Sequence, residues 1–484
     1  TMGIFDKYTV PNKCLDEVFD AATNNVKIPY ETVAKVFETM NVEQFDKLHN
    51  LIKLSFFNQG ITYQVYSENI SQEHIFPFDP FPRLITSEEW DTIEKGVIQR
   101  SRALNMFLKD VYNDRKILKD KIIPEEMILS SPHYCKQMIG FRPKGDIYCH
   151  INGTDLIKHN DGNNYVLEDN LRSPSGVSYV LNNREALKRA LSDLFHHYSI
   201  QPVRDYPEEL LMMMQSVSHK SQAESLCVLL TPGMYNSAYF EHMFLAQQMG
   251  IELVEGRDLF VKNDKVYMQT TTGAKQVDVI YRRIDDDYLD PDVFKKDSML
   301  GVKGIMRAYL SGNVTLVNAP GTGVADDKAI YHYVPQIIKY YLGEEPILNN
   351  VHTYICSDEK DMKYVLEHLA ELVVKPVDMS GGYGISIGNT LSKEELSELK
   401  DKIKANPRQW IAQPILSLSM HSTYIESEKV FEPRHVDLRT YALIGDKYEH
   451  VLKGGLTRVA LKKGSLIVNS SQGGGSKDTW VIGK

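Results

Sequence analysis

The sequence is poor in cysteine and has no long apolar run. Five cysteines occur among 484 residues, and no two of them form a C-x-x-C pair. A small, odd and scattered set does not indicate a disulfide framework or a structural zinc site, and it favours a reducing compartment. No apolar run approaches the roughly 20 residues of a membrane span, and no basic segment followed by an apolar one stands near the start. We therefore expect a protein of the cytoplasm without a membrane partner.

The chain also lacks an excess of positive charge. Its 55 Lys and Arg residues face 64 Asp and Glu residues, which gives a formal net charge of −9. This balance, without a basic patch interleaved with aromatic residues, argues against nucleic acid as a partner. A hydrophobic fraction of 42% and a charged fraction of 25% are typical of a globular protein. The length leaves room for about two to four domains.

Changes of pattern along the chain predict four regions. Residues 1–145 are mostly helical, with apolar residues at helical spacing before and after a proline-rich turn, "FPFDPFPRL". Residues 146–200 hold two strands joined by the turn-forming "HNDGNN". Residues 201–320 alternate strands and helices, which predicts a small parallel α/β domain. Residues 321–484 contain a helix and several further strands.

A lysine followed by a glycine-rich loop is the first candidate site. The segment "VVKPVDMSGGYGISIG" begins at Val373 as a strand that carries Lys375, and the loop 380–384 follows. A fixed ammonium group beside a flexible loop with free N–H groups favours a phosphate-binding site. A surface turn that carries a lysine is the alternative, and the two interpretations are about equally supported by this segment alone.

Other polar residues follow the same theme along the chain. Lys328 stands at the start of a predicted helix, where a solvated lysine is the alternative, and Gln413 lies in an apolar strand, where its amide faces either an adenine edge or the core. Arg439 and Arg458 lie on two later strands and could stabilise a transferred phosphoryl group or form surface salt bridges. This order resembles the ATP-grasp superfamily, in which two α+β subdomains hold ATP between them.

The acidic strand and the E-x-N motif that usually end an ATP-grasp domain stand near the front of this chain. Asp155 lies on one predicted strand, and Glu168 and Asn170 point to the same side of the next. Hard oxygen ligands on paired strands suit Mg²⁺, whereas solvated carboxylates on a polar hairpin are the alternative. Metal strands that come before lysine strands are what a circular permutation gives.

Eight segments, from "FPFDPFPRLI" to "VNSSQGGGSKDTW", resemble the circularly permuted ATP-grasp family, type 2, a group of bacterial proteins often labelled glutathionylspermidine synthase-like. They cover residues from about 75 onward. The resemblance implies an α+β, circularly permuted ATP-grasp fold with a Rossmann-like pre-ATP-grasp domain and a helical N-terminal region. It implies ATP and Mg²⁺ as cofactors and the joining of a carboxylate to an amine, as amide or peptide bond formation, through an acyl phosphate.

The resemblance also implies roles for residues in this sequence. Lys328 and Lys375 would hold phosphates and Gln413 would face the base, while Arg439 and Arg458 would stabilise the reacting phosphoryl group. The glycine-rich loop would cover the nucleotide with Ser380, Gly381, Gly382, Tyr383 and Gly384. The metal ligands would be Asp155, Glu168 and Asn170. A second loop over the reacting carboxylate would contain Asn469, Gln472, Gly473 and Gly474.

The substrates are small-molecule or peptide carboxylates and amines on this interpretation. "YRRIDDDYLDP" follows a strand of the α/β domain, so that Arg282 and Arg283 could bind a carboxylate and Asp285 an amine, with a solvated charge run as the alternative. Arg172, Ser173 and Ser175 come directly after the metal strands and are further substrate candidates. Two other functions remain open: an ATP-dependent phosphotransferase acting on a small molecule, and a non-catalytic nucleotide-binding assembly protein of the same fold.

Overall fold

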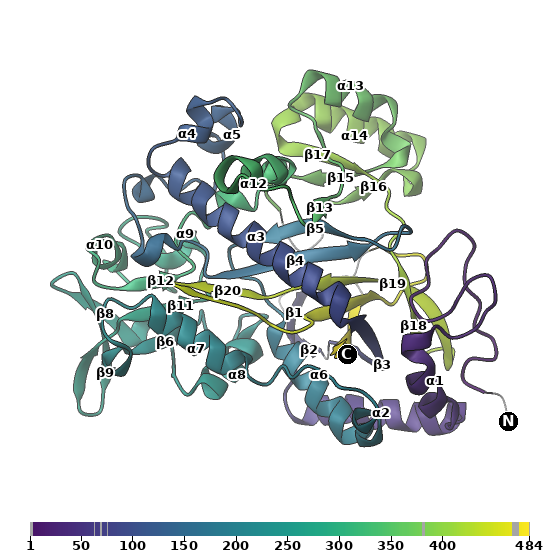
Figure 1. The fold of residues 1–484 in the computed structure, drawn as a ribbon. Helices are drawn as coiled ribbons and strands as arrows, with labels where there is room; N and C mark the ends of the chain where they lie inside the picture. The colour runs from purple at the N-terminus through teal and green to yellow at the C-terminus, as the bar shows by residue number, and fades with distance from the viewer. Residues whose placement is uncertain are drawn as a thin grey trace.

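A mixed central sheet runs through the molecule, and smaller parts pack around it (Figure 1). The structure is a computed structural model that describes residues 3–61, 63–67, 70–74, 76–379, 383–466 and 474–483. The strands follow the order β13-β5-β4-β19-β22-β23-β3, with β18 beside β19 and β20 beside β4 and β21. These strands are Asn349–Asn350 (β13), Asn164–Asn170 (β5), Ile151–Lys158 (β4), Val430–Arg439 (β19), Leu456–Ala460 (β22), Gly474–Ile482 (β23), Phe78–Thr86 (β3), Met420–Ile425 (β18), Ala442–Gly445 (β20) and Tyr448–Val451 (β21).

The N-terminal region is helical, as the spacing of its apolar residues predicts. Its long helix α3 begins where the Thr86 side chain accepts a hydrogen bond from the backbone N–H of Glu89 at 3.3 Å. Helix α3 crosses the central sheet, and α6 follows the β4–β5 hairpin (Figure 1). The elements are Glu31–Glu38 (α1), Val42–Asn58 (α2), Ser87–Val111 (α3), Lys116–Lys119 (α4), Glu125–Leu129 (α5) and Val177–Ala190 (α6), together with the antiparallel pair Tyr63–Ser67 (β1) and Ile70–His74 (β2).

The prediction that "FPFDPFPRL" forms a turn is wrong. Most of this segment is strand β3, which pairs in parallel with β23 at the edge of the sheet. Pro80 and Pro82 have no N–H to donate, and they fall where the register of the two strands shifts. The prolines thus mark an irregular edge strand, whose partner lies almost 400 residues away in the sequence.

Residues 201–320 form the predicted parallel α/β part. Its sheet has the order β12-β11-β6-β7, and all three pairings are parallel. The elements are Tyr206–Ser216 (α7), Cys227–Leu230 (β6), Tyr239–Met249 (α8), Glu252–Val254 (β7), Val279–Arg282 (β11), Asp286–Leu289 (α9), Ile305–Leu310 (α10) and Thr315–Val317 (β12). The sequence interpretation did not separate out the antiparallel sheet Leu259–Lys262 (β8), Lys265–Thr270 (β9) and Gly273–Gln276 (β10).

A further small sheet with two helices lies beside the central sheet (Figure 1). It has the order β14-β17-β15-β16, and its core packs Val374 and Ala412 against Leu399 of α14. The single helix expected before it is divided at Tyr333, because Pro335 lies at the first turn of the second part. The elements are Lys328–His332 (α11), Val334–Leu342 (α12), Tyr354–Ile355 (β14), Glu359–Glu367 (α13), Leu372–Pro376 (β15), Ser386–Ile387 (β16), Lys393–Ala405 (α14) and Trp410–Pro414 (β17).

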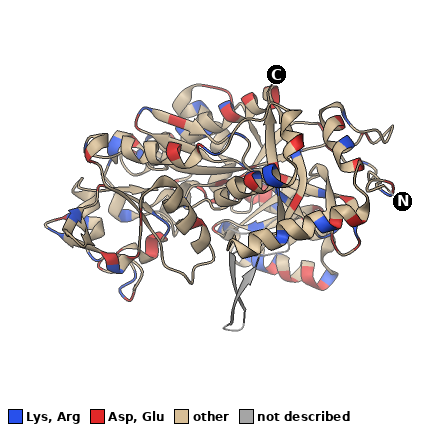
Figure 2. Ribbon diagram, turned by 90° about the horizontal axis from the view of Figure 1, so that it is seen from below, with Lys and Arg blue, Asp and Glu red and all other residues tan. Residues whose placement is uncertain are grey.

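Charged residues of both signs are interspersed along the described ribbon (Figure 2). Among the described residues, no helix is both long and apolar enough to cross a membrane.

Candidate functional site

The β4–β5 hairpin brings two carboxylates and an amide side by side. Asp155 lies opposite Glu168, and Gly153 lies opposite Asn170. A bulge leaves Leu167 without a partner in this register, so that Leu167 and Glu168 both reach the same pocket. The hairpin therefore presents several oxygen atoms from adjacent strands.

Two arginines of neighbouring strands hold Asp155. Arg439 of β19 pairs with Asp155 in the sheet, and its Nε and Nη2 donate to the two carboxylate oxygens at 2.8 and 3.1 Å. Arg458 of β22 donates from Nη2 to Asp155 at 3.0 Å. Its Nε and Nη2 also donate to the Asp437 carboxylate at 2.9 and 2.6 Å. The four side chains form an alternating row of charges inside the sheet.

This row moves the pKa values of its two carboxyl groups in opposite directions. Burial alone would raise the pKa of Asp155, but the charges of Arg439 and Arg458 outweigh burial and lower it. Burial raises the pKa of Asp437, which the charge of Arg458 only partly offsets. Asp155 thus stays an anion next to the pocket, as a metal ligand must.

Lys375 enters the same space from the small sheet. Its Nζ donates to Oε1 of Gln413 on the adjacent strand β17 at 2.8 Å, and Nε2 of Gln413 donates to Oγ1 of Thr353 at 3.1 Å. Burial lowers the pKa of Lys375 to about 8, although the charge of Glu168 opposes this shift. The Gln413 amide therefore holds Lys375 with its oxygen and is itself held by Thr353 through its nitrogen, so that both of its ends have partners within the protein.

Lys328 reaches the site from the first residue of α11. Asp327 caps this helix with a carboxylate oxygen that accepts from the Ala329 N–H at 2.8 Å. The Lys328 ammonium lies 3.6 Å from Oε1 of Glu168 and donates to the carbonyl oxygen of Met379. It thus stands between the acidic hairpin and the end of the strand that carries Lys375.

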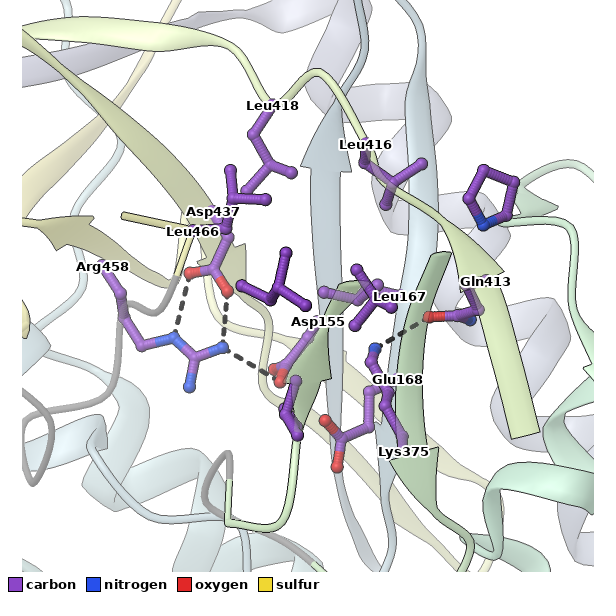
Figure 3. A pocket seen from close by; sticks show the side chains of 14 residues that line it. Asp155, Leu167, Glu168, Lys375, Gln413, Leu416, Leu418, Asp437, Arg458 and Leu466 are labelled. Atoms are coloured by element: carbon purple, nitrogen blue, oxygen red, sulfur yellow. Dashed lines mark hydrogen bonds and ion pairs between the residues drawn. The ribbon is translucent and has the colours of Figure 1, made fainter. Parts of the chain in front are cut away.

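Several of these side chains line one pocket between the small sheet and the central sheet (Figure 3). Its polar part is formed by Asp155, Glu168, Lys375, Gln413, Asp437 and Arg458. Figure 3 shows the side chains of Glu168 and Lys375 close to one another, with the Lys375 nitrogen turned toward Gln413. The apolar part is lined by Leu167, Val373, Ile385, Ile387, Pro414, Leu416, Leu418 and Leu466. A pocket with an apolar wall beside a cluster of charged groups fits a nucleotide, which has a flat base and charged phosphates.

A family model described as circularly permuted ATP-grasp type 2 matches residues 82–460. The chain belongs to this family. The match covers the β4–β5 hairpin, Lys328, Lys375, Arg439 and Arg458. The fold is therefore a circularly permuted ATP-grasp fold, in which the acidic β4–β5 hairpin precedes the strand that carries Lys375.

Similar proteins agree with this assignment. An uncharacterized protein of Synechocystis sp. is 53% identical over 434 residues, which are 90% of each chain. An uncharacterized protein of Mycobacterium tuberculosis is 47% identical over 480 residues, 99% of this chain and 86% of the relative. A protein of Frankia casuarinae named "Putative glutamate--cysteine ligase 2-2" is 39% identical over 468 residues, 96% of this chain but 53% of the relative. About half of that longer protein thus lies outside the matched part.

A solved structure of a glutathione synthetase-like effector from Globodera pallida, in its apo form, shares the fold. The two chains superpose with a TM-score of 0.60 over 92% of this chain and 98% of the other, at 11% sequence identity. At this identity the likeness concerns the ATP-grasp architecture alone.

The donor set of the hairpin fits a magnesium ion that arrives with a nucleotide. Among the described residues, no group of three or more His, Cys, Asp and Glu side chains could hold a metal ion. Asp155, Glu168 and Asn170 provide two carboxylates and one amide, whereas Mg²⁺ prefers six oxygen ligands. Phosphate and water oxygens would complete the shell. The donor set of the hairpin therefore suits an ion whose other ligands come from a nucleotide and water.

The two glycine-rich loops are described only in part. Ser380, Gly381 and Gly382 of the first loop, and Asn469, Gln472 and Gly473 of the second, lie outside the described residues. Tyr383 is 55% exposed, and Gly384 has a φ of +74°. A Cβ atom at Gly384 would lie 2.8 Å from Cγ of Pro376, so that this turn requires glycine for its conformation and its space. Gly474 begins β23 opposite Ala460.

The segment after β5 connects the pocket to the α/β part. Arg172 forms an ion pair of 3.1 Å with Asp326, and its side chain is one-third exposed. The carbonyl oxygen of Ser175 accepts hydrogen bonds from Arg439 Nη1 at 3.3 Å and from the Tyr441 hydroxyl at 2.8 Å. Ser173 lies between them in the sequence. These contacts put the segment next to the arginines of the ATP-grasp site.

Arg282 and Arg283 are engaged in buried contacts of the α/β part. Arg282 donates to the carbonyl oxygens of Asn318 and Ile284, each at 2.9 Å, and forms an ion pair of 2.7 Å with Asp286. Arg283 lies 3.0 Å from Glu241. Asp285 precedes α9 and is exposed. Neither the Arg282 nor the Arg283 guanidinium lines the pocket that contains Lys375. A substrate that contacts either arginine would therefore have to lie outside this pocket.

Sequence reasoning missed the apolar wall and two polar residues of the site. After Gln413, Leu416 and Leu418 alternate with serines in the sequence. This alternation of apolar and polar residues was a signal in the sequence for one wall of the pocket. Asp437 could be placed only on the same strand face as Arg439, because its partner Arg458 comes from another strand. Thr353 carried no sequence signal, since its contact with Gln413 depends on strands brought together by folding.

Proposed function

We propose that the protein is an ATP- and Mg²⁺-dependent ligase that joins a carboxylate to an amine through an acyl phosphate. The observation that carries this proposal is the convergence in one pocket of Lys375 from the small sheet and Asp155 and Glu168 from the central sheet. A metal-bound triphosphate requires such an arrangement, because the cations that contact its phosphates and the carboxylates that bind its metal must lie within the length of one nucleotide.

The nucleotide would lie with its base in the apolar part of the pocket. Leu416 and Leu418 would pack against the base, and Lys375 and Lys328 would contact its phosphates. Gln413 would act by holding the ammonium of Lys375, because both ends of its amide already have protein partners. The loop 380–384 would cover the phosphates with backbone N–H groups.

Asp155, Glu168 and Asn170 would hold Mg²⁺, which supplies charge neutralisation at the phosphate oxygens when it is bound. Arg439 and Arg458 would stabilise the negative charge of the transferred phosphoryl group. In Figure 3 one terminal nitrogen of Arg458 has no dashed line to its neighbours, and it is the donor that such a group could take.

The reaction would need no protein nucleophile. A substrate carboxylate oxygen attacks the γ-phosphorus, the bond to the β-phosphate oxygen breaks, and ADP leaves. The amine nitrogen then attacks the acyl carbon of the acyl phosphate, the carbon–oxygen bond to phosphate breaks, and the amine loses a proton as the amide forms. Positioning and electrostatic stabilisation would supply the rate enhancement.

The segments next to Arg439 would bind the two substrates. Arg172 and the serines Ser173 and Ser175 are the nearest candidates, and the exposed Asp285 could take an amine. The second glycine-rich loop, with Asn469, Gln472, Gly473 and Gly474, would cover the reacting carboxylate. The printed name of the Frankia relative makes α-amino acids the first class of substrate to test.

We also infer that the protein acts in the cytoplasm, on small molecules or peptides. The scattered free cysteines and the charge balance support this inference. Neither nucleic acid nor a membrane surface is proposed as a partner.

A screen of substrates with ADP detection tests the proposal. Amino acids, polyamines and short peptides would be offered singly and in pairs, with mass spectrometry of the products. A ligase releases ADP and phosphate only when both substrates are present, and the product lacks one water relative to them. A stable phosphorylated product would instead identify a phosphotransferase. ATP binding without turnover of any pair would favour a nucleotide-binding assembly protein.

A further inference from the structure

A buried ion pair lies directly behind the metal-ligand strand. Along β5 the side chains alternate, so that Glu168 and Asn170 face the site whereas Asp169 points to the opposite side. There Nε and Nη2 of Arg100, on α3, donate to the two oxygens of Asp169, each at 2.7 Å. Each of these side chains is 1% exposed. We infer that Arg100 and Asp169 are positioning residues that hold the metal ligands of β5 in register with Lys328.

The same guanidinium connects β5 to the helix that carries Lys328. Nη1 of Arg100 donates to Oδ1 of Asn350 at 2.7 Å, and Nδ2 of Asn350 donates to the carbonyl oxygen of Tyr331 at 2.7 Å. The guanidinium carbon lies 5.5 Å from the centre of the Tyr331 ring. Tyr331 belongs to α11, which begins at Lys328.

Tyr331 also closes this network back onto β5. Its hydroxyl donates to the carbonyl oxygen of Val166, two residues before Glu168, and accepts from the backbone N–H of Val351 at 2.8 Å. One continuous set of hydrogen bonds therefore runs from Arg100 through Asn350 and Tyr331 to the metal strand. It fixes the strand that offers Glu168 relative to the helix that offers Lys328.

The charges of Arg100 and Asp169 indicate that this pair positions strand β5 in addition to filling the core. A buried ion pair gains little stability over apolar side chains of the same volume, because both charges lose their hydration. A planar guanidinium with several fixed donors does, however, define the place and the orientation of each partner. Residues that orient metal ligands from behind typically contribute 10- to 100-fold to metal affinity. This inference rests on the proposed function, because it presumes that Glu168 and Asn170 hold Mg²⁺.

The test compares Arg100→Lys with Arg184→Lys. Arg184 is equally buried and donates from Nε to Asp478, at 3.1 and 2.9 Å, but it joins α6 to β23 instead of the metal strand. Both variants keep the charge and lose the planar fork. Binding of Mn²⁺ in the presence of a non-hydrolysable ATP analogue would be followed by electron paramagnetic resonance, and thermal melts would report stability.

We expect Arg100→Lys to weaken Mn²⁺ binding about 10- to 100-fold, and Arg184→Lys to leave it within about twofold at a similar loss in Tm. Equal effects of the two variants on Mn²⁺ binding would overturn the inference. If Arg100→Lys does not fold, the double variant Arg100→Met with Asp169→Leu removes both charges, and it should fold yet bind Mn²⁺ as weakly. Wild-type affinity in that variant would also overturn it. Failure of the wild-type protein to bind Mn²⁺ and nucleotide would instead refute the proposed function.

Discussion

Charge balance around Asp155 and Lys375 decides what the pocket can bind. The described site brings four cations, Lys328, Lys375, Arg439 and Arg458, toward three carboxylates, which leaves a net charge of about +1. Every carboxylate except Glu168 is bonded to an arginine. An anion with its own divalent cation fits such a site better than a free anion or a free metal ion, because neither sign is left in large excess.

Lys375 predicts a pH dependence of ATP affinity. Its ammonium is buried, and its pKa of about 8 in the ligand-free protein lies well below the usual range for lysine. Below pH 8 the group is charged and ready to contact a phosphate, whereas above pH 8 binding must first take up a proton. We expect ATP affinity to fall by up to about tenfold per pH unit as pH rises through 8 to 9.5.

Titration calorimetry in two buffers of different ionisation enthalpy checks this prediction. The number of protons taken up per ATP should increase above pH 8 in the wild-type protein. Lys375→Ala should bind ATP at least about tenfold more weakly at pH 7 and should lose this proton uptake. Unchanged ATP affinity in Lys375→Ala would remove the lysine from the site.

Glu168 predicts a defect in metal use without a defect in folding. Its carboxylate is partly exposed, and its nearest cation is Lys328 at 3.6 Å, so that Glu168→Gln should change the free energy of unfolding by less than about 1 kcal/mol. A direct ligand should matter more than the roughly 10- to 100-fold that an orienting residue contributes. Titration of Mg²⁺ in the turnover assay should therefore show that the apparent affinity for Mg²⁺ falls by more than about a hundredfold. A wild-type Mg²⁺ requirement would contradict the assignment of Glu168 as a ligand.

At the scale of elements, the sequence was most informative where the signal is local. The β4–β5 hairpin could be predicted because "HNDGNN" forms its turn and because Asp155, Glu168 and Asn170 stand at fixed places in two short strands. Strand β3 was missed, because its two prolines resemble a turn unless the irregular pairing with β23 is known. Arg282 and Arg283 stood in a charge run, and sequence alone does not separate charges that pair inside the fold from charges that face a ligand.

The hairpin packs closely against the segment that follows it, and this close packing requires a glycine at position 153. Gly153 lies opposite Asn170, and a Cβ atom at Gly153 would come within 2.6 Å of Cβ of Pro174. Gly153→Ala should therefore displace Pro174 or β5, cost about 1–3 kcal/mol of stability, and weaken the response to Mg²⁺. Denaturant unfolding and Mn²⁺ binding would measure the two effects.

Lys158→Ala provides the control for that experiment, because it removes an ion pair with Glu89 at the other end of the same strand. This variant should lose some stability and keep wild-type Mn²⁺ affinity. If Gly153→Ala also kept wild-type Mn²⁺ affinity, the close packing of Pro174 on β4 would not contribute to metal binding.

At the scale of the whole molecule, the permuted order makes the pocket depend on complete folding. Glu168 and Lys375 lie about 200 residues apart in the chain, and the α/β part is inserted between them. Circular permutation changes only where the chain is cut, so the strands still meet in the ATP-grasp arrangement. The order of motifs could be inferred from the sequence, whereas the pairing of Arg439 with Asp155 required the sheet itself.

Buried histidines predict that this whole fold is sensitive to mild acid. Burial lowers the pKa of His150 to about 3 and that of His242 to about 2, and it lowers the pKa of His421 as well. In the unfolded chain each group would have its usual pKa near 6.5, so that below this pH the unfolded state binds more protons than the folded state. The contribution of these groups to stability is therefore complete above pH 6.5 and is lost as pH falls, by about 1.4 kcal/mol per pH unit for each histidine.

Three such groups lose about 4 kcal/mol per pH unit together, against a total of about 5–15 kcal/mol for a typical protein. Urea unfolding between about pH 7 and 5 should thus show a steep fall in the free energy of unfolding. His150→Met should reduce this slope by about a third. The His150 side chain is fully buried, so that an apolar side chain of similar volume can fill its place. A flat pH profile in the wild-type protein would mean that these three histidines are protonated, and hence hydrated, in the folded state.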